Sequence, residues 1–121
     1  MDLKTSVDEL NAMILRGEVL PAFDRFYASN VVMNEVGEEP RVGKAVNREL
    51  EEKWVEGVRT FHSAEVKNVA VNETSPGTGV AFVEWFMHYD HDFADGEVKV
   101  EQVAAQEWEN GQIVRETFYH G

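Results

Sequence analysis

The chain has 121 residues, of which 43% are hydrophobic and 28% charged, and this length predicts a single globular domain over residues 1–121. Eleven Lys and Arg against 23 Asp and Glu give a formal net charge of -12, which repels phosphate backbones and anionic lipid and argues against nucleic-acid or membrane partners. The chain has no cysteine, which excludes disulfides, thiolate catalysis and cysteine-ligated metal centres, and it shows neither an apolar leader nor a membrane-length apolar run, so we expect a cytoplasmic protein.

Two short helices are predicted at the start of the chain. Apolar residues recur at helical spacing from Leu3 onward, with Thr5 or Ser6 as the candidate N-cap, and the pattern stops near Gly17. A second helix begins close to Pro21, which is tolerated in a first turn because an N–H group there would have no helical partner. Together the two segments predict a helical hairpin.

A short strand and a third helix follow. The run 31–36 is rich in β-branched residues and ends in the turn-forming stretch 37–40. Segment 44–57 has apolar residues near one face, charged residues elsewhere and a final glycine, which predicts an amphipathic helix. The apolar face comprises Val46, Leu50, Trp54 and Val55.

The second half of the chain has the pattern of an antiparallel sheet. Helical spacing ends at Arg59, and Asp95-Gly96 and Asn110-Gly111 are strong hairpin signals. The predicted strands cover residues 59–73, 79–92, 97–109 and 112–120. Strands of this length predict a sheet that bends strongly and wraps around a cavity. Helices segregated from an antiparallel sheet define the α+β class.

Three stretches carry a resemblance to a known family: 26–35 (FYASNVVMNE), 102–108 (QVAAQEW) and 111–119 (GQIVRETFY). In these stretches and in the order of its elements, the chain resembles the nuclear transport factor 2-like superfamily, and within it the SnoaL-like polyketide cyclase and ketosteroid isomerase group. With the element order, the resemblance covers nearly the whole chain. It implies a cone in which three N-terminal helices pack on a strongly curved antiparallel sheet around an internal pocket, and a homodimer through the sheet's outer face. It implies no particular reaction, because this fold hosts enzymes, binders and transport factors.

Alternation in the strand 97–109 separates a covered face from a charged one. The even positions from Val98 to Trp108 are apolar except for Gln102 and Gln106, whereas most odd positions are charged. Two glutamines on a covered face need hydrogen-bond partners. Either a pocket ligand or neighbouring groups in the sheet would supply them.

The strand 79–92 is apolar at both parities, which predicts that both of its faces are covered. One face would line the pocket and the other a subunit interface. We assign Trp85, Met87 and Tyr89 to the pocket. The opposite choice would bring Glu84 and His88 inside.

For the last strand, the resemblance to the isomerase-type C-terminal strand indicates which residues face inward. The inward set is Val114, Glu116, Phe118 and His120, and the outward set is Ile113, Arg115, Thr117 and Tyr119. Glu116 would then stand near Gln106. A carboxylate that faces an apolar cavity has a raised pKa and can act as a general acid or base, although it could equally be paired for structural reasons.

Glu35 occupies, by resemblance, the place at the end of the first strand where ketosteroid isomerase carries its proton-abstracting carboxylate. That isomerase also uses a tyrosine of the first helix and a protonated aspartate of a late strand. Here no tyrosine precedes Tyr27 and Ala104 stands at the aspartate's place, which argues against steroid-type isomerisation. The other interpretation of Glu35 is a solvated acidic loop shared with Glu38 and Glu39.

The run 88–92 (HYDHD) contains imidazole and carboxylate groups, which bind zinc, iron or manganese. In a strand, His88 and Asp90 share a face, but the sequence places no third ligand beside them. We therefore predict no metal site. His62 is expected at the pocket mouth or in a structural role.

Three functions remain open. The first is an enzyme that needs no cofactor, a cyclase, isomerase or dehydratase in which Glu35 or Glu116 moves a proton on a small hydrophobic molecule. The second is a non-catalytic binder, and the third is a dimeric interaction domain. The predicted ligand contacts are Trp54, Trp85, Tyr89, Gln102, Gln106, Phe118 and His120.

Overall fold

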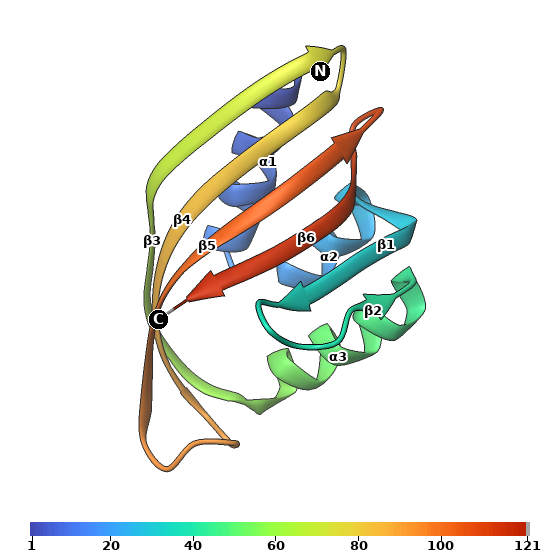
Figure 1. Ribbon diagram of the computed structural model, residues 1–121. Coiled ribbons are helices and arrows are strands. Elements are labelled where there is room, and N and C mark those ends of the chain that lie inside the picture. The colour runs from blue at the N-terminus through green and yellow to red at the C-terminus, as the bar shows by residue number, and fades with distance from the viewer. Residues whose placement is uncertain (121) are drawn as a thin grey trace.

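Three helices lie against a six-stranded sheet in the computed structural model, which describes residues 1–120 (Figure 1). The helices are α1 (Leu3–Leu15), α2 (Val19–Phe26) and α3 (Lys44–Gly57). The strands are β1 (Tyr27–Glu35), β2 (Arg41–Val42), β3 (Val58–Ser75), β4 (Thr78–His91), β5 (Glu97–Glu109) and β6 (Gln112–His120). This arrangement confirms the predicted α+β class. In the described part of the chain, no helix combines the length and apolarity that crossing a membrane requires.

The sheet has the strand order β2-β1-β6-β5-β4-β3. Strands β3 to β6 form the predicted antiparallel meander. Strand β1 differs from the expectation because it pairs in parallel with β6, with Met33 opposite Glu116. This pairing covers an edge of β6 that would otherwise expose unpaired backbone groups. The sheet is therefore mixed at one side.

Strong curvature is visible in β3, β4 and β5, which bend partway along their length (Figure 1). The pairing of β3 with β4 shifts register in four places, among them between Phe61 and Ser63. A β-bulge places an extra residue on one strand and bends it. The concave side of the sheet faces α1 and α2, as the predicted cone requires.

The hydrophobic core fills one end of this cone. Its fully buried members include Leu3, Val7 and Leu10 of α1, Val31 of β1, Val83 of β4 and Ile113 of β6. Trp108 is 1% exposed, and its ring meets Phe26 edge-on with centroids 5.8 Å apart. Because this packing uses the N-terminal part of α1, the other end of the cone is left for a cavity.

The N-cap prediction for α1 was wrong. Asp2 caps the helix, and its side chain accepts a hydrogen bond from the Thr5 backbone N–H at 2.8 Å. Ser6 lies inside the helix and is buried. Asp and Ser are both good N-caps, so the local sequence alone did not separate them.

The facing of two residues in β6 was also predicted wrongly. Trp108 pairs with Ile113, whereas Glu107 pairs with Arg115, so Val114 is an extra residue between two paired positions. Ile113 is therefore fully buried, and Val114 is only partly buried. Beyond this bulge the predicted alternation is restored.

Helix α3 is less covered than its pattern predicted. Val46 and Leu50 are 50% and 42% exposed, respectively. The helix is anchored at both ends: the buried Asn47 donates hydrogen bonds to the Arg41 and Gly43 carbonyls, and the Trp54 carbonyl accepts a hydrogen bond from His91 Nε2 at 2.8 Å.

Candidate functional site

A cavity of about 840 Å³ lies between the concave face of the sheet, the C-terminal half of α1 and helix α3. Its walls are mainly apolar. Helix α1 contributes Leu10 and Ile14, α3 contributes Trp54, and β4 contributes Trp85 and Met87. The polar groups come from several elements, so the acidic residues stand at separate positions on an otherwise apolar wall.

The structure brings all of the predicted site residues to this one cavity. They are Glu35, Trp54, Trp85, Tyr89, Gln102, Gln106, Glu116, Phe118 and His120. The facing assigned to β4 is also observed, because Trp85 and Tyr89 are buried and line the cavity together with Met87.

Glu116 is the buried acid of the cavity, with only 2% of the residue exposed. Tyr27 donates its hydroxyl to Oε1 at 2.5 Å, and Gln106 donates Nε2 to Oε2 at 2.8 Å. Gln106 in turn accepts a hydrogen bond from Trp108 Nε1 at 3.0 Å, which fixes the orientation of the amide. These four side chains form one connected network.

Burial raises the pKa of Glu116 to about 7. The hydrogen bonds from Tyr27 and Gln106 oppose this shift because they stabilise the carboxylate, while the charges of Glu51 and Glu35 reinforce it. Both protonation states are therefore populated near neutral pH. A group with this property can either accept or donate a proton.

Tyr27 is a site residue that the sequence did not reveal. It lies where α2 passes into β1, and its ring stacks on Phe23 with centroids 4.5 Å apart. Burial, followed by the charge of Glu116, raises the pKa of Tyr27 well above its usual value, so the hydroxyl remains a donor. No spacing pattern indicates this contact, since it depends on the parallel pairing of β1 with β6.

A second carboxylate lies at the ends of β1 and β6. Glu35 Oε2 is 2.9 Å from His120 Nε2, and both residues line the cavity. Glu35 belongs to the strand, whereas Glu38 and Glu39 are exposed in the following turn. The acidic-loop interpretation therefore fits the latter two residues and not Glu35.

Glu51 and Arg41 add further charges to the cavity wall. The sequence pattern predicted neither of them as a site residue. Burial raises the pKa of Glu51, the guanidinium of Arg41 lowers it, and the charge of Glu35 raises it. Glu51 lies on the inner side of α3, whose helical pattern marked only the apolar positions.

Asn11 is a buried polar residue that faces the same cavity. It is 5% exposed, and its Oδ1 atom has no hydrogen-bond partner within residues 1–120. Buried amide oxygens normally have a partner. This atom can accept a hydrogen bond from a molecule inside the cavity. The sequence offered no signal beyond a single polar residue on a helix.

The structure also shows where Ala104 and His62 lie. Ala104 is 2% exposed and lines the cavity, so a methyl group stands where the resemblance places the isomerase's second acid. His62 does not line the cavity; its ring stacks on His88 with centroids 4.4 Å apart. Its predicted place at the mouth was therefore wrong.

No protein-family model and no curated protein matches this sequence. Solved structures do match it. Over 99% of this chain and 100% of the other, it resembles a protein of Mesorhizobium loti named as a SnoaL-like polyketide cyclase, with 18% identity and a TM-score of 0.75. A protein of Pseudomonas putida named as a polyketide cyclase matches over 100% of this chain and 92% of its own, with 21% identity and a TM-score of 0.73.

A third structure comes from Catenulispora acidiphila and is described as having a ketosteroid isomerase-like fold, in complex with trimethylamine. It matches over 91% of this chain and 81% of its own, with 10% identity and a TM-score of 0.69. Identities this low establish the fold alone. The chain has the nuclear transport factor 2-like fold, as its sequence predicted.

Proposed function

We propose that this protein, built on the nuclear transport factor 2-like fold, binds a small and largely apolar molecule in its cavity and moves a proton on it with Glu116. The observation that carries the proposal is the buried Glu116, whose pKa of about 7 suits proton transfer at neutral pH. Cyclisation, isomerisation and dehydration all need a base that removes a proton and an acid that returns one. No cofactor enters this chemistry.

The other side chains would bind and orient the ligand. Trp54, Trp85 and Phe118 offer apolar surface, while Asn11 and Gln102 offer polar atoms along the same walls. A ligand with a hydroxyl or amine group would satisfy the Asn11 Oδ1 atom. Tyr27 and Gln106 act as positioning residues, because their hydrogen bonds hold the carboxylate of Glu116 in place.

Glu35 would be the second acid or base. Its partner His120 lies 2.9 Å away, and the pair is more exposed to solvent than Glu116 is. Two carboxylates in different environments can take different roles in one reaction. In this proposal Glu116 exchanges a proton with the ligand, and Glu35 with His120 exchanges protons with water.

A non-catalytic binder is the second candidate. It is favoured by the closed network at Glu116, in which both carboxylate oxygens and both amide ends of Gln106 have protein partners. A network of this kind can serve only to satisfy buried polar groups. The ligand class would be the same, and proton transfer would be absent.

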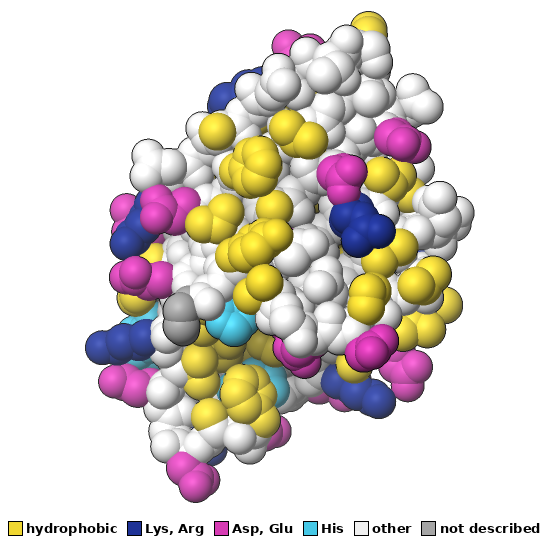
Figure 2. All heavy atoms as spheres, viewed as in Figure 1, with side chains coloured by type: hydrophobic (Ala, Val, Ile, Leu, Met, Phe, Trp, Pro, Cys, Tyr) yellow, Lys and Arg dark blue, Asp and Glu magenta, His cyan; other side chains and the backbone are white. Residues whose placement is uncertain are grey.

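We further propose a homodimer through the outer patch, which we define as Phe82, Phe86, Val103, Ala105 and Tyr119. These residues lie on β4, β5 and β6 on the side of the sheet away from the cavity. Figure 2, which views this side, shows hydrophobic side chains gathered over the middle of the strands. Phe82 and Tyr119 are 47% and 49% exposed, and an exposed apolar group of this kind marks an interaction surface.

Exchange of carbon-bound hydrogen of a ligand for solvent deuterium tests the catalytic proposal, and it does not require that the product be known. Small hydrophobic ketones and lactones would first be screened by quenching of tryptophan fluorescence, because Trp54 and Trp85 line the cavity. Bound compounds would then be incubated in heavy water and followed by NMR. We expect deuterium to enter the carbon next to the carbonyl group in the presence of the protein.

Glu116→Gln is the decisive variant. The exchange rate should fall at least about a hundredfold, the usual contribution of a general acid or base, while ligand affinity changes little. Glu101→Gln is the matched control, because Glu101 is exposed on the outer side of β5. Binding without exchange in the wild type would favour the non-catalytic binder, and equal exchange in Glu116→Gln would remove Glu116 from the chemistry.

A further inference from the structure

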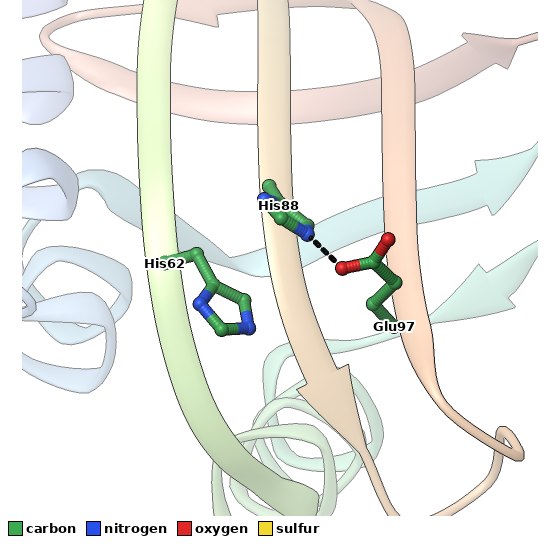
Figure 3. A group of neighbouring side chains, drawn as sticks. All are labelled: His62, His88 and Glu97. Atoms are coloured by element: carbon green, nitrogen blue, oxygen red, sulfur yellow. Dashed lines mark hydrogen bonds and ion pairs between the residues drawn. The ribbon is translucent and has the colours of Figure 1, made fainter.

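We propose that the outer side of the sheet holds a binding site for a divalent transition-metal ion, with zinc as the best match, formed by His62, His88 and Glu97. The three side chains point toward one another from neighbouring strands (Figure 3). One ligand atom from each lies within 4.8 Å of the other two. This site is independent of the cavity and of the function proposed for it.

A bulge in β3 brings His62 to this group. Phe61 pairs with Tyr89 and Ser63 pairs with His88, so His62 is the extra residue between two paired positions. Phe61 lines the cavity, whereas His62 lies against His88. Bulges re-aim side chains in this way. The sequence could not supply this third ligand, because alternation in β3 does not predict the bulge.

Register also sets the other two ligands on the outer side. His88 follows Met87 and precedes Tyr89, both of which line the cavity, so His88 faces the opposite way. Lys99 pairs with His88, and Glu97 lies two residues earlier on the same strand face. Diagonal neighbours at this spacing are within reach of long side chains.

The side chains must rotate to hold one ion, because their ligand atoms are separated by distances of up to 4.8 Å and the two stacked rings do not direct their nitrogen lone pairs at a common point. His88 Nε2 is 2.7 Å from Glu97 Oε2, and the two imidazole rings are stacked with centroids 4.4 Å apart. In a tetrahedral zinc site, bonds of about 2.0–2.1 Å place neighbouring ligand atoms about 3.3 Å apart. The carboxylate must therefore move away from His88 by roughly half an ångström to admit the ion.

The chemistry of these groups favours zinc. Imidazole nitrogen and carboxylate oxygen are ordinary zinc ligands, and three protein ligands leave a fourth position for water. Asp90 Oδ1 lies 3.3 Å from His62 Nε2 and gives this ring a carboxylate partner, as metal-binding histidines usually have.

Lys99 is the competing cation at this site. Its Nζ atom is 3.8 Å from Glu97 Oε1, so it lies close to the carboxylate that would bind the metal. Metal binding must displace or tolerate this positive charge. We therefore expect Lys99→Gln to bind zinc several-fold more tightly than the wild type, since it removes a like charge from the site.

The test is zinc binding by the untagged protein after treatment with a chelator. Competition with a chromophoric chelator measures the affinity and the number of ions bound, and absorption of bound Co²⁺ reports imidazole ligation. We expect one ion per chain. Glu97→Gln should weaken binding at least about tenfold, and the double variant His62→Ala/His88→Ala should abolish it, because no ligand pair remains.

Two controls separate this site from other metal-binding groups. Glu101→Gln removes a carboxylate from the same strand and the same face, next to Lys67 rather than the histidines, and should bind zinc as the wild type does. His120→Gln removes the histidine that pairs with Glu35 in the cavity and should also leave binding unchanged.

Thermal unfolding gives a second readout. Zinc should raise the unfolding temperature of the wild type and leave that of His62→Ala/His88→Ala unchanged, because only the folded state brings the ligands together. A wild type that takes up no stoichiometric zinc would overturn the proposal and leave a solvated ion-pair cluster. Equal zinc affinity in the double variant, or loss of binding in His120→Gln, would overturn it too.

Discussion

Glu116 connects the chemistry of the cavity to the stability of the fold. Its pKa lies at about 7 in the folded protein against a reference value of 4.5. At pH values between 4.5 and about 7, Glu116 is mostly protonated in the folded protein and mostly ionised in the unfolded chain. The contribution of Glu116 to the free energy of unfolding is therefore highest below about pH 4.5. This contribution is lost as the pH rises through the folded pKa of about 7.

A single substitution isolates this pH dependence. The free energy of unfolding of the wild type, measured by denaturant titration at pH 5 and at pH 8, should contain a loss of roughly 2.5 kcal/mol from Glu116. Glu116→Gln should lack this part of the loss. The amide fits the same place, because the hydroxyl of Tyr27 can rotate and accept from it. An equal pH dependence in both proteins would contradict the raised pKa.

Tyr27→Phe tests the donor that faces Glu116. Loss of the hydroxyl removes a hydrogen bond to the carboxylate, so the pKa of Glu116 should rise further above about 7, and stability at neutral pH should fall by about 1–3 kcal/mol. The ring of Phe23 would still stack on the new side chain.

NMR titration of the Glu116 side-chain carboxyl carbon measures the first effect directly. Tyr89→Phe is the matched control, since Tyr89 lines the cavity and meets Trp54 rather than Glu116. An unchanged titration midpoint in Tyr27→Phe would show that the contact contributes nothing to the pKa.

Among the secondary-structure elements, the junction of α3 with β4 lies beside the cavity wall. Helix α3 carries Trp54 and Glu51 to the cavity wall, yet two of its apolar residues are exposed. At the last turn of the helix, His91 is hydrogen-bonded to the Trp54 carbonyl and to the Phe93 backbone N–H. The His91 of the acidic run is therefore structural.

Gly57→Ala should loosen this junction. A Cβ atom at residue 57 would lie 2.2 Å from His91 Cε1, and the ring is held by hydrogen bonds through both nitrogens. We expect a loss of about 1–3 kcal/mol in the free energy of unfolding, the usual cost of overpacking, although alanine favours helix.

A double-mutant cycle identifies the cause of that loss. In a His91→Ala background the ring is absent, so Gly57→Ala should cost little or nothing. The measurement is denaturant unfolding of the four proteins. Additive losses would show that the glycine is required for some reason other than contact with His91.

At the scale of the whole molecule, the two sides of the sheet carry different groups of residues. The concave side holds the core and the cavity, and the outer side holds the outer patch and, at one end, the histidine cluster. A net charge of -12 keeps such chains apart in general. The proposed dimer would therefore depend on the apolar middle of the outer side.

Phe82→Glu tests the dimer. The wild type should have the mass of a dimer by light scattering at micromolar concentration, and the variant should be monomeric, because a carboxylate would be buried against the partner's apolar surface. Phe93→Glu is the matched control, since Phe93 is 68% exposed and lies in the turn after β4. A monomeric wild type would refute the proposed dimer.

The sequence by itself determined the three helices, the four long strands and the faces of β4, β5 and most of β6. Helical spacing placed α3 at 44–57, and turn residues bounded the four long strands to within two residues. Alternation in β5 placed Gln102 and Gln106 on the covered face of the strand, and both line the cavity. These features are local, because a few consecutive residues are enough to show the helical or strand period of the apolar positions.

Only the tertiary structure decided which distant residues meet. The contact between Tyr27 and Glu116 joins residues 89 positions apart and requires the parallel pairing of β1 with β6. The bulges at His62 and Val114 each insert one residue and reverse the facing of their neighbours, which alternation cannot foresee. Packing across the whole chain decides which strands pair and in which register, and for this reason only the fold brings together the acid network and the cluster of His62, His88 and Glu97.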